Sequence, residues 1–265
     1  MSCLVVIPMY GKEEYTLKCI EFVQKNAGCD HDILVVDDGS KTPFADQFDP
    51  IPKVDILRLR ENSGFTNAVN QGILWAQRRN YDYVLLLNND TEPEKNFLKE
   101  LIDVMESDKV IGIAGSVRRH PKKEGEPIEL CGSDLIRGFQ YFCEESKLPK
   151  DPIPCNWFAL CSGLLRMDMV REIGLLDKRM RNHCSDTKYC FQAKFSNWSV
   201  VIVPTSIVVH HLSVTTTANG VLVDDDQKLM LEWLAGLDQA KLMSTMPLDG
   251  EKKTWGQLSF EVYVK

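Results

Sequence analysis

Short apolar runs alternate with amphipathic segments along the first hundred residues, and this alternation limits the chain to few folds. Three of the runs are apolar throughout, so strands built from them are buried on both faces. Between the runs, apolar side chains recur at the spacing of one helix face. Buried strands separated by helices predict a mostly parallel sheet covered by helices. The expected strands are Leu4–Ile7, Ile33–Val36, Val54–Leu59 and Tyr83–Leu87, and the expected helices are Glu13–Lys25, Phe65–Gln77 and Pro93–Glu106.

Polar residues follow three of these strands at the point where each strand ends. They are Pro8–Tyr10, Asp37–Ser40 and Asn88–Asp90. Parallel strands end at the same edge of a sheet, and ligands of open α/β sheets bind at that edge. We therefore expect these residues to meet at one site.

The second half of the chain is less regular. A polar, solvated loop is expected after a strand, followed by a short helix, two strands and a long amphipathic helix that packs on the domain. These elements are Val110–Val117, the loop His120–Pro127, Asp186–Phe195, Val200–Val203, Ile207–His211 and Asp224–Met243.

Composition excludes several classes of protein. Apolar residues make up 44% of the 265 residues, an ordinary value for a globular protein, and no apolar run approaches the roughly 18 residues of a membrane span. The formal net charge is −7, which argues against a nucleic-acid partner. An anionic ligand therefore needs local help from a cation, a helix N-terminus or a few basic side chains. The nine cysteines include no C-x-x-C pair, so they are expected to be free, buried thiols of a reducing compartment.

Five segments, taken in order, resemble the family 2 glycosyltransferases of the GT-A fold, particularly the subgroup that includes rhamnosyltransferases. Single motifs of this kind are weak, but five in the right order are a strong signal. The segments are Val5–Tyr10, Ile33–Ser40, Asn62–Ile73, Leu85–Asp90, and Gly174–Asp177 followed by Ser185-Asp186.

The resemblance implies a Rossmann-like, mostly parallel central sheet flanked by helices. Residues 1–220 are then the GT-A domain, with a nucleotide-binding half over about 1–117 and an acceptor-binding half over about 118–220, and residues 221–265 are a C-terminal helical extension. By the same resemblance, a nucleotide-sugar contacts Pro8, Tyr10, Asp37, Asp38, Gly64, Asn67, Asn88 and Asn89.

Asp37 and Asp38 end a strand, and Gly39-Ser40 supplies a tight turn. Turn formation and helix capping are one explanation of such residues. We favour a functional explanation, because adjacent carboxylates repel each other and a turn needs only one of them. The resemblance implies that one carboxylate accepts a hydrogen bond from the pyrimidine ring of the nucleotide, with Tyr10 lining the same pocket.

Asn88–Asp90 is the candidate metal-binding segment, although Asn and Asp also suit a turn before a helix. Mn²⁺ and Mg²⁺ prefer carboxylate, phosphate and water oxygens, and take one or two protein carboxylates. Asp90 supplies that carboxylate, whereas the neutral Asn88 replaces the first Asp of the family's Asp-x-Asp motif. The resemblance adds a histidine ligand at His210; His211, the next residue of the strand, points to the opposite face.

Asp186 is the candidate catalytic base. The alternative is that it caps the short helix that follows. The family has a Glu-Asp pair here with a second acid two residues later, whereas this chain has Ser185 and Lys188 at those positions.

The sequence thus predicts an inverting, metal-dependent transferase. It is expected to move a hexosyl or deoxyhexosyl group, rhamnosyl among the candidates, from a UDP- or dTDP-sugar to a hydroxyl of a glycan or glycoconjugate. The alternatives are a non-catalytic nucleotide-sugar-binding protein and a sugar nucleotidyltransferase. A nucleotidyltransferase is expected to have a Gly-rich basic loop near its N-terminus, which this sequence lacks. The expected location is cytoplasmic, with attachment to a membrane-bound glycan assembly and homo-oligomerisation both left open.

Overall fold

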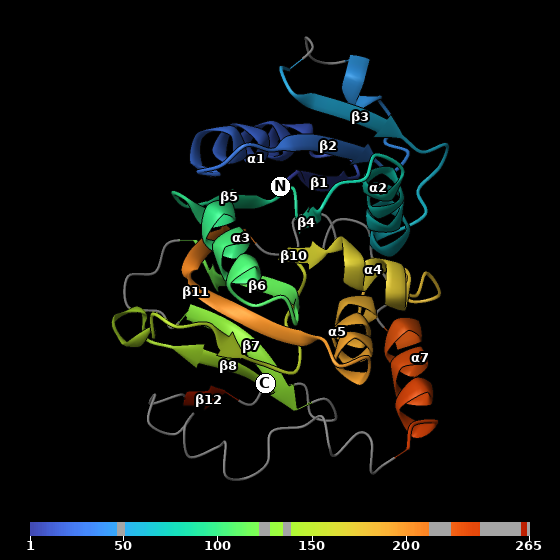
Figure 1. The fold of residues 1–265 in the computed structure, drawn as a ribbon. Coiled ribbons are helices and arrows are strands. Elements are labelled where there is room, and N and C mark those ends of the chain that lie inside the picture. The colour runs from blue at the N-terminus through green and yellow to red at the C-terminus, as the bar shows by residue number, and fades with distance from the viewer. Residues whose placement is uncertain (47–50, 122–127, 135–138, 212–223, 239–260, 264–265) are drawn as a thin grey trace.

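The structure is a computed structural model that describes residues 1–46, 51–121, 128–134, 139–211, 224–238 and 261–263. Its first half is the expected parallel sheet with helices between the strands (Figure 1). The strands β1 (Cys3–Met9), β2 (Asp32–Asp37), β3 (Val54–Arg58) and β4 (Tyr83–Leu87) lie in the order β3-β2-β1-β4, and all three neighbouring pairs are parallel. The helices α1 (Glu13–Asn26) and α2 (Phe65–Arg78) agree with the predicted ranges to within one residue at each end.

Side chains of the central strands point alternately to two separate hydrophobic clusters, as the pleat of a strand requires. In β1, Leu4 and Val6 belong to the cluster under α2, whereas Val5 and Ile7 belong to the cluster under α1 and α3 (Phe97–Ser107). Each helix therefore covers one face, and the strands are buried on both, as their apolar runs predicted.

The sheet continues in the second half with strands of both directions. The strand β10 (Ser162–Arg166) lies between β4 and β6 (Ile111–Arg119) and is antiparallel to both. Beyond β6, the strand β11 (Ser199–His210) is parallel to it. The remaining strands are β5 (Thr91–Pro93), β7 (Ile128–Asp134), β8 (Phe139–Cys143), β9 (Ile153–Pro154) and β12 (Glu261–Tyr263), and two short 3-10 helices cover Phe44–Asp46 and Glu145–Lys147.

Two predicted boundaries are wrong. The helix expected from Pro93 begins only at Phe97, because Thr91–Pro93 forms β5 and pairs with the end of β11. The two strands expected on either side of Pro204 are one strand, β11, whose pairing with β6 changes register between Val203 and Ile207. Of the expected loop at 120–127, residues 122–127 lie outside the described part of the chain.

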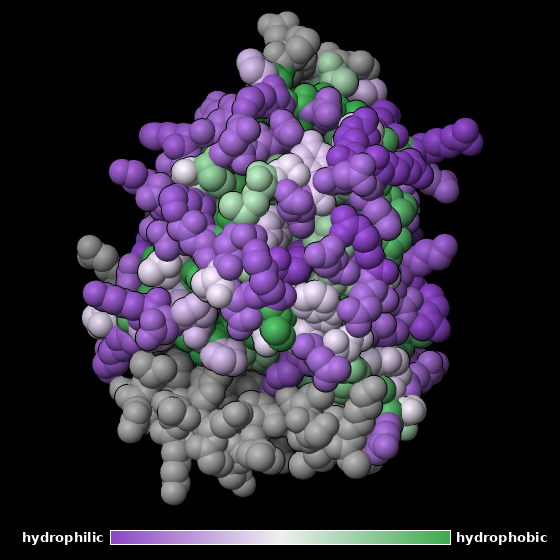
Figure 2. Space-filling view, viewed as in Figure 1, coloured by the Kyte–Doolittle hydropathy of each residue, from purple (hydrophilic) through white to green (hydrophobic). Residues whose placement is uncertain are grey.

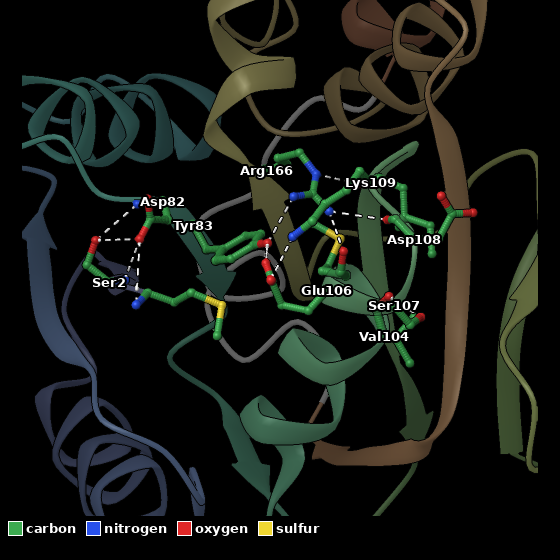
Figure 3. Close-up of polar contacts among 12 residues, drawn as sticks. Ser2, Asp82, Tyr83, Val104, Glu106, Ser107, Asp108, Lys109 and Arg166 are labelled. Carbon is green, nitrogen blue, oxygen red and sulfur yellow. Dashed lines mark hydrogen bonds and ion pairs between the residues drawn. The ribbon is translucent and has the colours of Figure 1, made fainter.

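A buried arginine fixes the reversed strand β10 in the sheet (Figure 3). The guanidinium of Arg166 donates to the Tyr83 hydroxyl at 2.9 Å and to the Ile111 carbonyl at 2.9 Å, and it also bonds the Met105 carbonyl at the end of α3. Tyr83 in turn donates to Glu106. A cation at a helix C-terminus satisfies carbonyls that have no partner in the helix, so one side chain joins β4, β6, β10 and α3.

The C-terminal amphipathic helix packs on the domain, as expected. The helix α7 (Asp224–Ala235) lies beside α5 (Ser185–Phe195) in Figure 1, with α4 (Met167–Ile173) above them. Met230 and Leu234 of α7 form a small cluster with Met180 and Phe191. The predicted helix extends to Met243, but α7 ends at Ala235, just before Gly236, and 239–243 lie outside the described residues.

The surface agrees with the composition. On the face shown in Figure 2, most of the coloured residues are hydrophilic, and hydrophobic ones occur in small groups. No helix in the described ranges is both long enough and apolar enough to cross a membrane. Seven cysteines are described with their side chains; all seven are free, and most of them are buried.

Candidate active site

A cavity of about 940 Å³ opens at the carboxyl ends of the parallel strands. Its wall is formed by the ends of β1, β2 and β4, the start of α2, the loop before α5, and the start of α7. Among the residues predicted from the sequence, those lining it are Pro8, Tyr10, Asp38, Gly64, Asn88, Asn89, Asp90, Asp186 and His210. Asp37 and Asn67 are outside the lining.

Asp37 is fully buried and holds the turn that follows β2. Its carboxylate accepts hydrogen bonds from the backbone amides of Ser40 and Phe44, at 2.8 and 3.2 Å, and from the guanidinium of Arg58 at 2.5 Å. Contrary to the expectation of nucleotide contact, the structure places Asp37 behind the cavity wall. Asn67 is likewise turned to a local partner, since its amide donates to the Ser63 hydroxyl at 2.7 Å.

Asp38 lines the cavity and ties the end of β2 to the start of α2. Its Oδ1 accepts bonds from the Ser63 amide and hydroxyl, at 2.8 and 2.7 Å, and its Oδ2 accepts one from the Gly64 amide at 2.8 Å. A carboxylate has about four lone-pair sites, so one acceptor position is left for a ligand. Burial raises the pKa of Asp38, although these bonds oppose the rise.

Gly64 is required where it stands. Its φ of +93° disfavours other residues, and a Cβ there would lie 2.3 Å from Cγ of Arg181. The close approach lets the loop before α5 pack directly against the start of α2.

Asp90 and His210 form a buried pair in the cavity. The Asp90 Oδ1 atom lies 3.0 Å from Nε2 of His210, and less than a tenth of either side chain is exposed. Burial opposes protonation of His210, but the neighbouring Cys161 sulfur and the Asp90 carboxylate outweigh it and raise the pKa of His210 to about 9. The ring is therefore protonated at neutral pH, and a cation must displace that proton to bind.

The side-chain atoms of Asp90, His210 and Asn88 suit a hard divalent cation that is also bound by a phosphate group of the substrate. A carboxylate oxygen such as that of Asp90 is a ligand that Mn²⁺ and Mg²⁺ prefer, and the His210 ring nitrogen beside it could add a second ligand. In addition, Oδ1 of Asn88 is buried without a hydrogen-bond partner. Within the described part of the chain, no three His, Cys, Asp or Glu side chains form a complete metal cluster. An ion here therefore needs ligands from a substrate, as Mg²⁺ in phosphate-binding sites does.

Asp186 lies in the first turn of α5, with its carboxylate at the cavity. Its Oδ1 accepts a bond from the Thr187 amide at 2.7 Å, and its Oδ2 a long one from the Leu160 amide at 3.4 Å. The N-cap position belongs to Cys184, so Asp186 is not the N-cap residue, although its Oδ1 satisfies one first-turn amide of α5. Burial raises the pKa of Asp186, which makes its carboxylate a stronger base than an exposed one.

The two residues that replace family acids have structural partners. The Ser185 hydroxyl lies 2.8 Å from that of Thr66 and joins α5 to α2. Lys188 is buried, and its Nζ donates to Asp177 at 2.6 Å while lying over the ring of Trp233. Neither residue lines the cavity.

Several lining residues were not predicted from the sequence. The basic ones and those on α7 are Arg118, Arg179, Arg181, His183, Asp225 and Asp226. Acidic side chains at a helix start, such as the run Asp224–Asp226, are ordinarily explained by the helix dipole. A readable signal was present: Asp226 precedes Met230 and Trp233 by four and seven residues, so it lies on the apolar face of α7.

Comparison with known proteins identifies the family. The family model of glycosyl transferase family 2 matches residues 4–164. The chain is 25% identical over 207 residues to the dTDP-rhamnosyl transferase RfbF of Shigella flexneri, covering 77% of this chain and 67% of that protein. It is also 23% identical over 125 residues to the glycosyltransferase GlyG of Streptococcus pneumoniae serotype 4, covering 46% of this chain and 40% of that one.

Solved structures support the fold. A structure of GalNAc-T7 with UDP, GalNAc and Mn²⁺ superposes with a TM-score of 0.65 at 16% identity, over 81% of this chain and 44% of that one. A structure of S. aureus TarS 1–349 gives a TM-score of 0.54 at 14% identity, over 80% of this chain and 60% of that one. The chain thus spans less than half of GlyG and of GalNAc-T7. The GT-A fold agrees with the expectation, and the matched residues 4–164 are more than half of the chain: it belongs to glycosyl transferase family 2.

Proposed function

We propose that this protein is an inverting glycosyltransferase that uses a UDP- or dTDP-sugar and a divalent metal ion. One observation carries the proposal: a single cavity is lined by Asp38, by the Asp90–His210 pair and by Asp186. These groups match three tasks of such a transfer, which are recognition of the nucleotide, support of the leaving diphosphate and removal of a proton.

Asp38 and Tyr10 are assigned to the nucleotide base. The acceptor position left on Asp38 suits the ring N–H of uracil or thymine, whereas cytosine lacks that donor. Tyr10 is half-buried at the end of β1 and provides an aromatic surface in the same cavity.

Asp90 and His210 are assigned to a divalent ion, with Asn88 beside them. When bound, Mn²⁺ or Mg²⁺ neutralises negative charge on the diphosphate. The protein has a net charge of −7, so the basic side chains in the cavity, Arg118 and Arg181 among them, are its own contribution to holding an anionic ligand.

Asp186 is assigned to the acceptor hydroxyl as general base. Its carboxylate accepts the hydroxyl proton while the hydroxyl oxygen bonds to the anomeric carbon, and the bond from that carbon to the diphosphate oxygen breaks with its electron pair. The reaction is one displacement, which inverts the anomeric centre and needs no protein nucleophile.

The sugar and the acceptor follow less directly from the residues. The likeness to RfbF, a dTDP-rhamnosyl transferase matched over 207 residues, supports a deoxyhexosyl donor such as dTDP-rhamnose. The likeness to GalNAc-T7, whose structure was solved with UDP, GalNAc and Mn²⁺, supports a UDP-sugar and a divalent ion. We assign the acceptor to a glycan or glycoconjugate, as in polysaccharide biosynthesis.

The proposal is tested first by binding and then by turnover. The melting temperature is measured with UDP, dTDP, CDP and GDP, each with Mn²⁺ and with EDTA. A ligand at a hundred times its dissociation constant stabilises the folded state by about 2.7 kcal/mol. We expect this stabilisation for UDP or dTDP in the presence of Mn²⁺ but not in the presence of EDTA.

Release of nucleoside diphosphate from dTDP-rhamnose and from UDP-GalNAc, with a panel of glycan acceptors, then tests catalysis. Binding without any turnover favours the non-catalytic alternative. Absence of nucleotide binding contradicts both the catalytic and the non-catalytic function.

A further inference from the structure

The loop Arg181–His183 forms the part of the cavity wall that leads directly into Asp186. Only Cys184 and Ser185 separate it from the carboxylate, and Cys184 has a left-handed backbone with φ of 61°. The position of Asp186 therefore depends on what fixes this loop.

A carboxylate from the C-terminal helix holds all three amides of the loop. Oδ1 of Asp226 accepts the Arg181 amide, and its Oδ2 accepts the amides of Asn182 and His183, each at 2.8 Å. Asp226 is 4% exposed. Hydrogen bonds to a buried ionised group are stronger than neutral ones and restrict its partners to one geometry.

The other side of the loop is bonded to the start of α2. The Thr66 amide donates to the Arg181 carbonyl at 3.0 Å, and the Phe65 amide donates to Oδ1 of Asn182 at 3.2 Å. The loop is thus held between α2, which carries the Asp38-bound turn, and α7.

Hydrophobic packing holds the later turns of α7 against the domain. Met230 and Leu234, one and two turns further along α7, are buried against Met180 and Phe191. The ring of Trp233 lies 6.1 Å from that of Phe195. Figure 1 shows α7 next to α5, the helix whose first turn contains Asp186. Contacts that do not involve Asp226 thus fix the later turns of α7.

We propose that Asp226 is a positioning residue for the transfer reaction: it orders the loop Arg181–His183 and thereby sets the direction of the Asp186 carboxylate. This inference rests on the proposed function, in which Asp186 is the base. A misplacement of about 1 Å in a catalytic group can cost about a hundredfold in rate. A residue that only anchors α7 would instead affect stability, and turnover only to the extent that the protein unfolds.

The test compares Asp226→Asn with two variants on the same helix. Asn has the shape of Asp but presents an NH₂ group to amide donors, so at least one bond is lost. Met230→Ala weakens the packing of α7 without touching the amides. Glu232→Gln removes one negative charge from an exposed position of α7.

Each variant is measured for melting temperature, for affinity toward UDP and dTDP with Mn²⁺, and for release of nucleoside diphosphate from dTDP-rhamnose and UDP-GalNAc. Asp226→Asn is expected to lower kcat by about tenfold to a hundredfold in protein that is still folded at the assay temperature. Met230→Ala, at a comparable loss of melting temperature, and Glu232→Gln keep kcat within about twofold.

A second measurement needs no substrate. The carboxyl carbon of Asp186 is titrated by NMR, and its midpoint is expected to move in Asp226→Asn but not in Met230→Ala or Glu232→Gln. Equal kcat losses in Asp226→Asn and Met230→Ala, or an unmoved Asp186 titration, would overturn the inference. Absence of turnover in the wild type contradicts the proposed function instead, and the titration then decides the role of Asp226 alone.

Discussion

The two walls of the cavity are built in different ways. The nucleotide wall consists of Pro8, Tyr10, Asp38 and Asn88–Asp90, which follow the ends of adjacent strands. The loop wall consists of Arg179–His183 and Asp186, together with Asp225 and Asp226 of α7. Sheet hydrogen bonds fix the first, whereas side chains from distant elements fix the second.

Because of this difference, a substitution affects its neighbours less on the nucleotide wall than on the loop wall. On the nucleotide wall, the backbone is held by the β1–β2 and β1–β4 ladders, so removal of a side chain leaves its neighbours in place. On the loop wall, the amides of Arg181–His183 depend on one carboxylate, and Asp177 shares its own between Arg179 and Lys188. Loss of one group there disturbs several others.

The largest effect is expected for Asp186→Asn on the loop wall. Asn keeps the size of the side chain but removes its basicity, so single-turnover transfer with saturating donor and metal falls by about 10²–10⁴. Nucleotide affinity and melting temperature stay near the wild-type values. In the control Asp103→Asn, on the exposed side of α3, the transfer rate, the nucleotide affinity and the melting temperature all stay near the wild-type values. Transfer at the wild-type rate would remove Asp186 from the mechanism.

The pH profile of the wild type sharpens this prediction. Burial raises the pKa of Asp186, so the base becomes active only as pH rises through a value above the ordinary 3.9 or so of an aspartate. We expect kcat of the wild type to fall as pH decreases through the raised pKa of Asp186. The residual activity of Asp186→Asn should not show this fall.

Asp177→Asn should give the next largest effect, on stability. The side chains of Asp177 and Lys188 are only 14% and 6% exposed. The substitution leaves Lys188 buried without its ionic partner, which lowers the free energy of unfolding by about 3–5 kcal/mol at pH 7. The side-chain bond from Arg179, with Lys188, holds the pKa of Asp177 well below its usual value.

The pH dependence of that stability has a definite sign. An aspartate with a lowered folded-state pKa stabilises the protein above its unfolded-state pKa of about 3.9, and this stabilisation is lost as pH falls toward the folded-state value. Urea denaturation of wild type and Asp177→Asn should therefore differ most near neutral pH, and the difference should shrink below about pH 4. A constant difference would mean that the ion pair does not hold the loop wall.

A smaller effect is expected for Asp90→Ala on the nucleotide wall. Loss of the carboxylate should remove the gain in UDP or dTDP affinity that Mn²⁺ provides, a change of at least about tenfold. Calorimetric titration with Mn²⁺ and with EDTA measures it, and melting of the metal-free variant reports on the fold. Equal affinities for both proteins under both conditions contradict the metal assignment.

The smallest effect concerns the base. Cytosine has no ring N–H for the acceptor position left on Asp38, and a buried unpaired acceptor costs about 1–3 kcal/mol, so UDP or dTDP should bind at least several-fold better than CDP. Asp103→Asn, on the exposed side of α3, should leave this preference unchanged. A competition experiment that ranks CDP or GDP first excludes the role given to Asp38.

The predictability of the site follows the same division. Asp38 and Asp90 could be found because each follows an apolar strand, and a strand end fixes a side chain in space once the sheet is known. Asp186 was found through the resemblance to the family's motif, because α5 has no clear apolar face of its own. Asp37 shows the limit of that reasoning, because only the tertiary contact with Arg58 reveals that the first carboxylate of the pair faces inward.

The missed features depend on contacts between distant segments. The reversed strand β10 needed the buried bonds of Arg166 to be recognised, and no local pattern separates it from an apolar loop. Asp226 was readable only in part: its place on the apolar face of α7 indicated burial, but not which amides it meets.

The bond between Asp226 and the loop also has a consequence for the order in which the protein is made. Arg181 precedes its carboxylate partner by 45 residues, so the ribosome delivers the loop first and the group that orders it later. Chains fold from the N-terminus as they emerge, at about 5–20 residues per second. The parallel strands and the groups assigned to the nucleotide and the divalent ion, His210 included, therefore leave the ribosome before Asp226. A chain interrupted between His210 and Asp226 would carry those groups without the carboxylate that orders the loop.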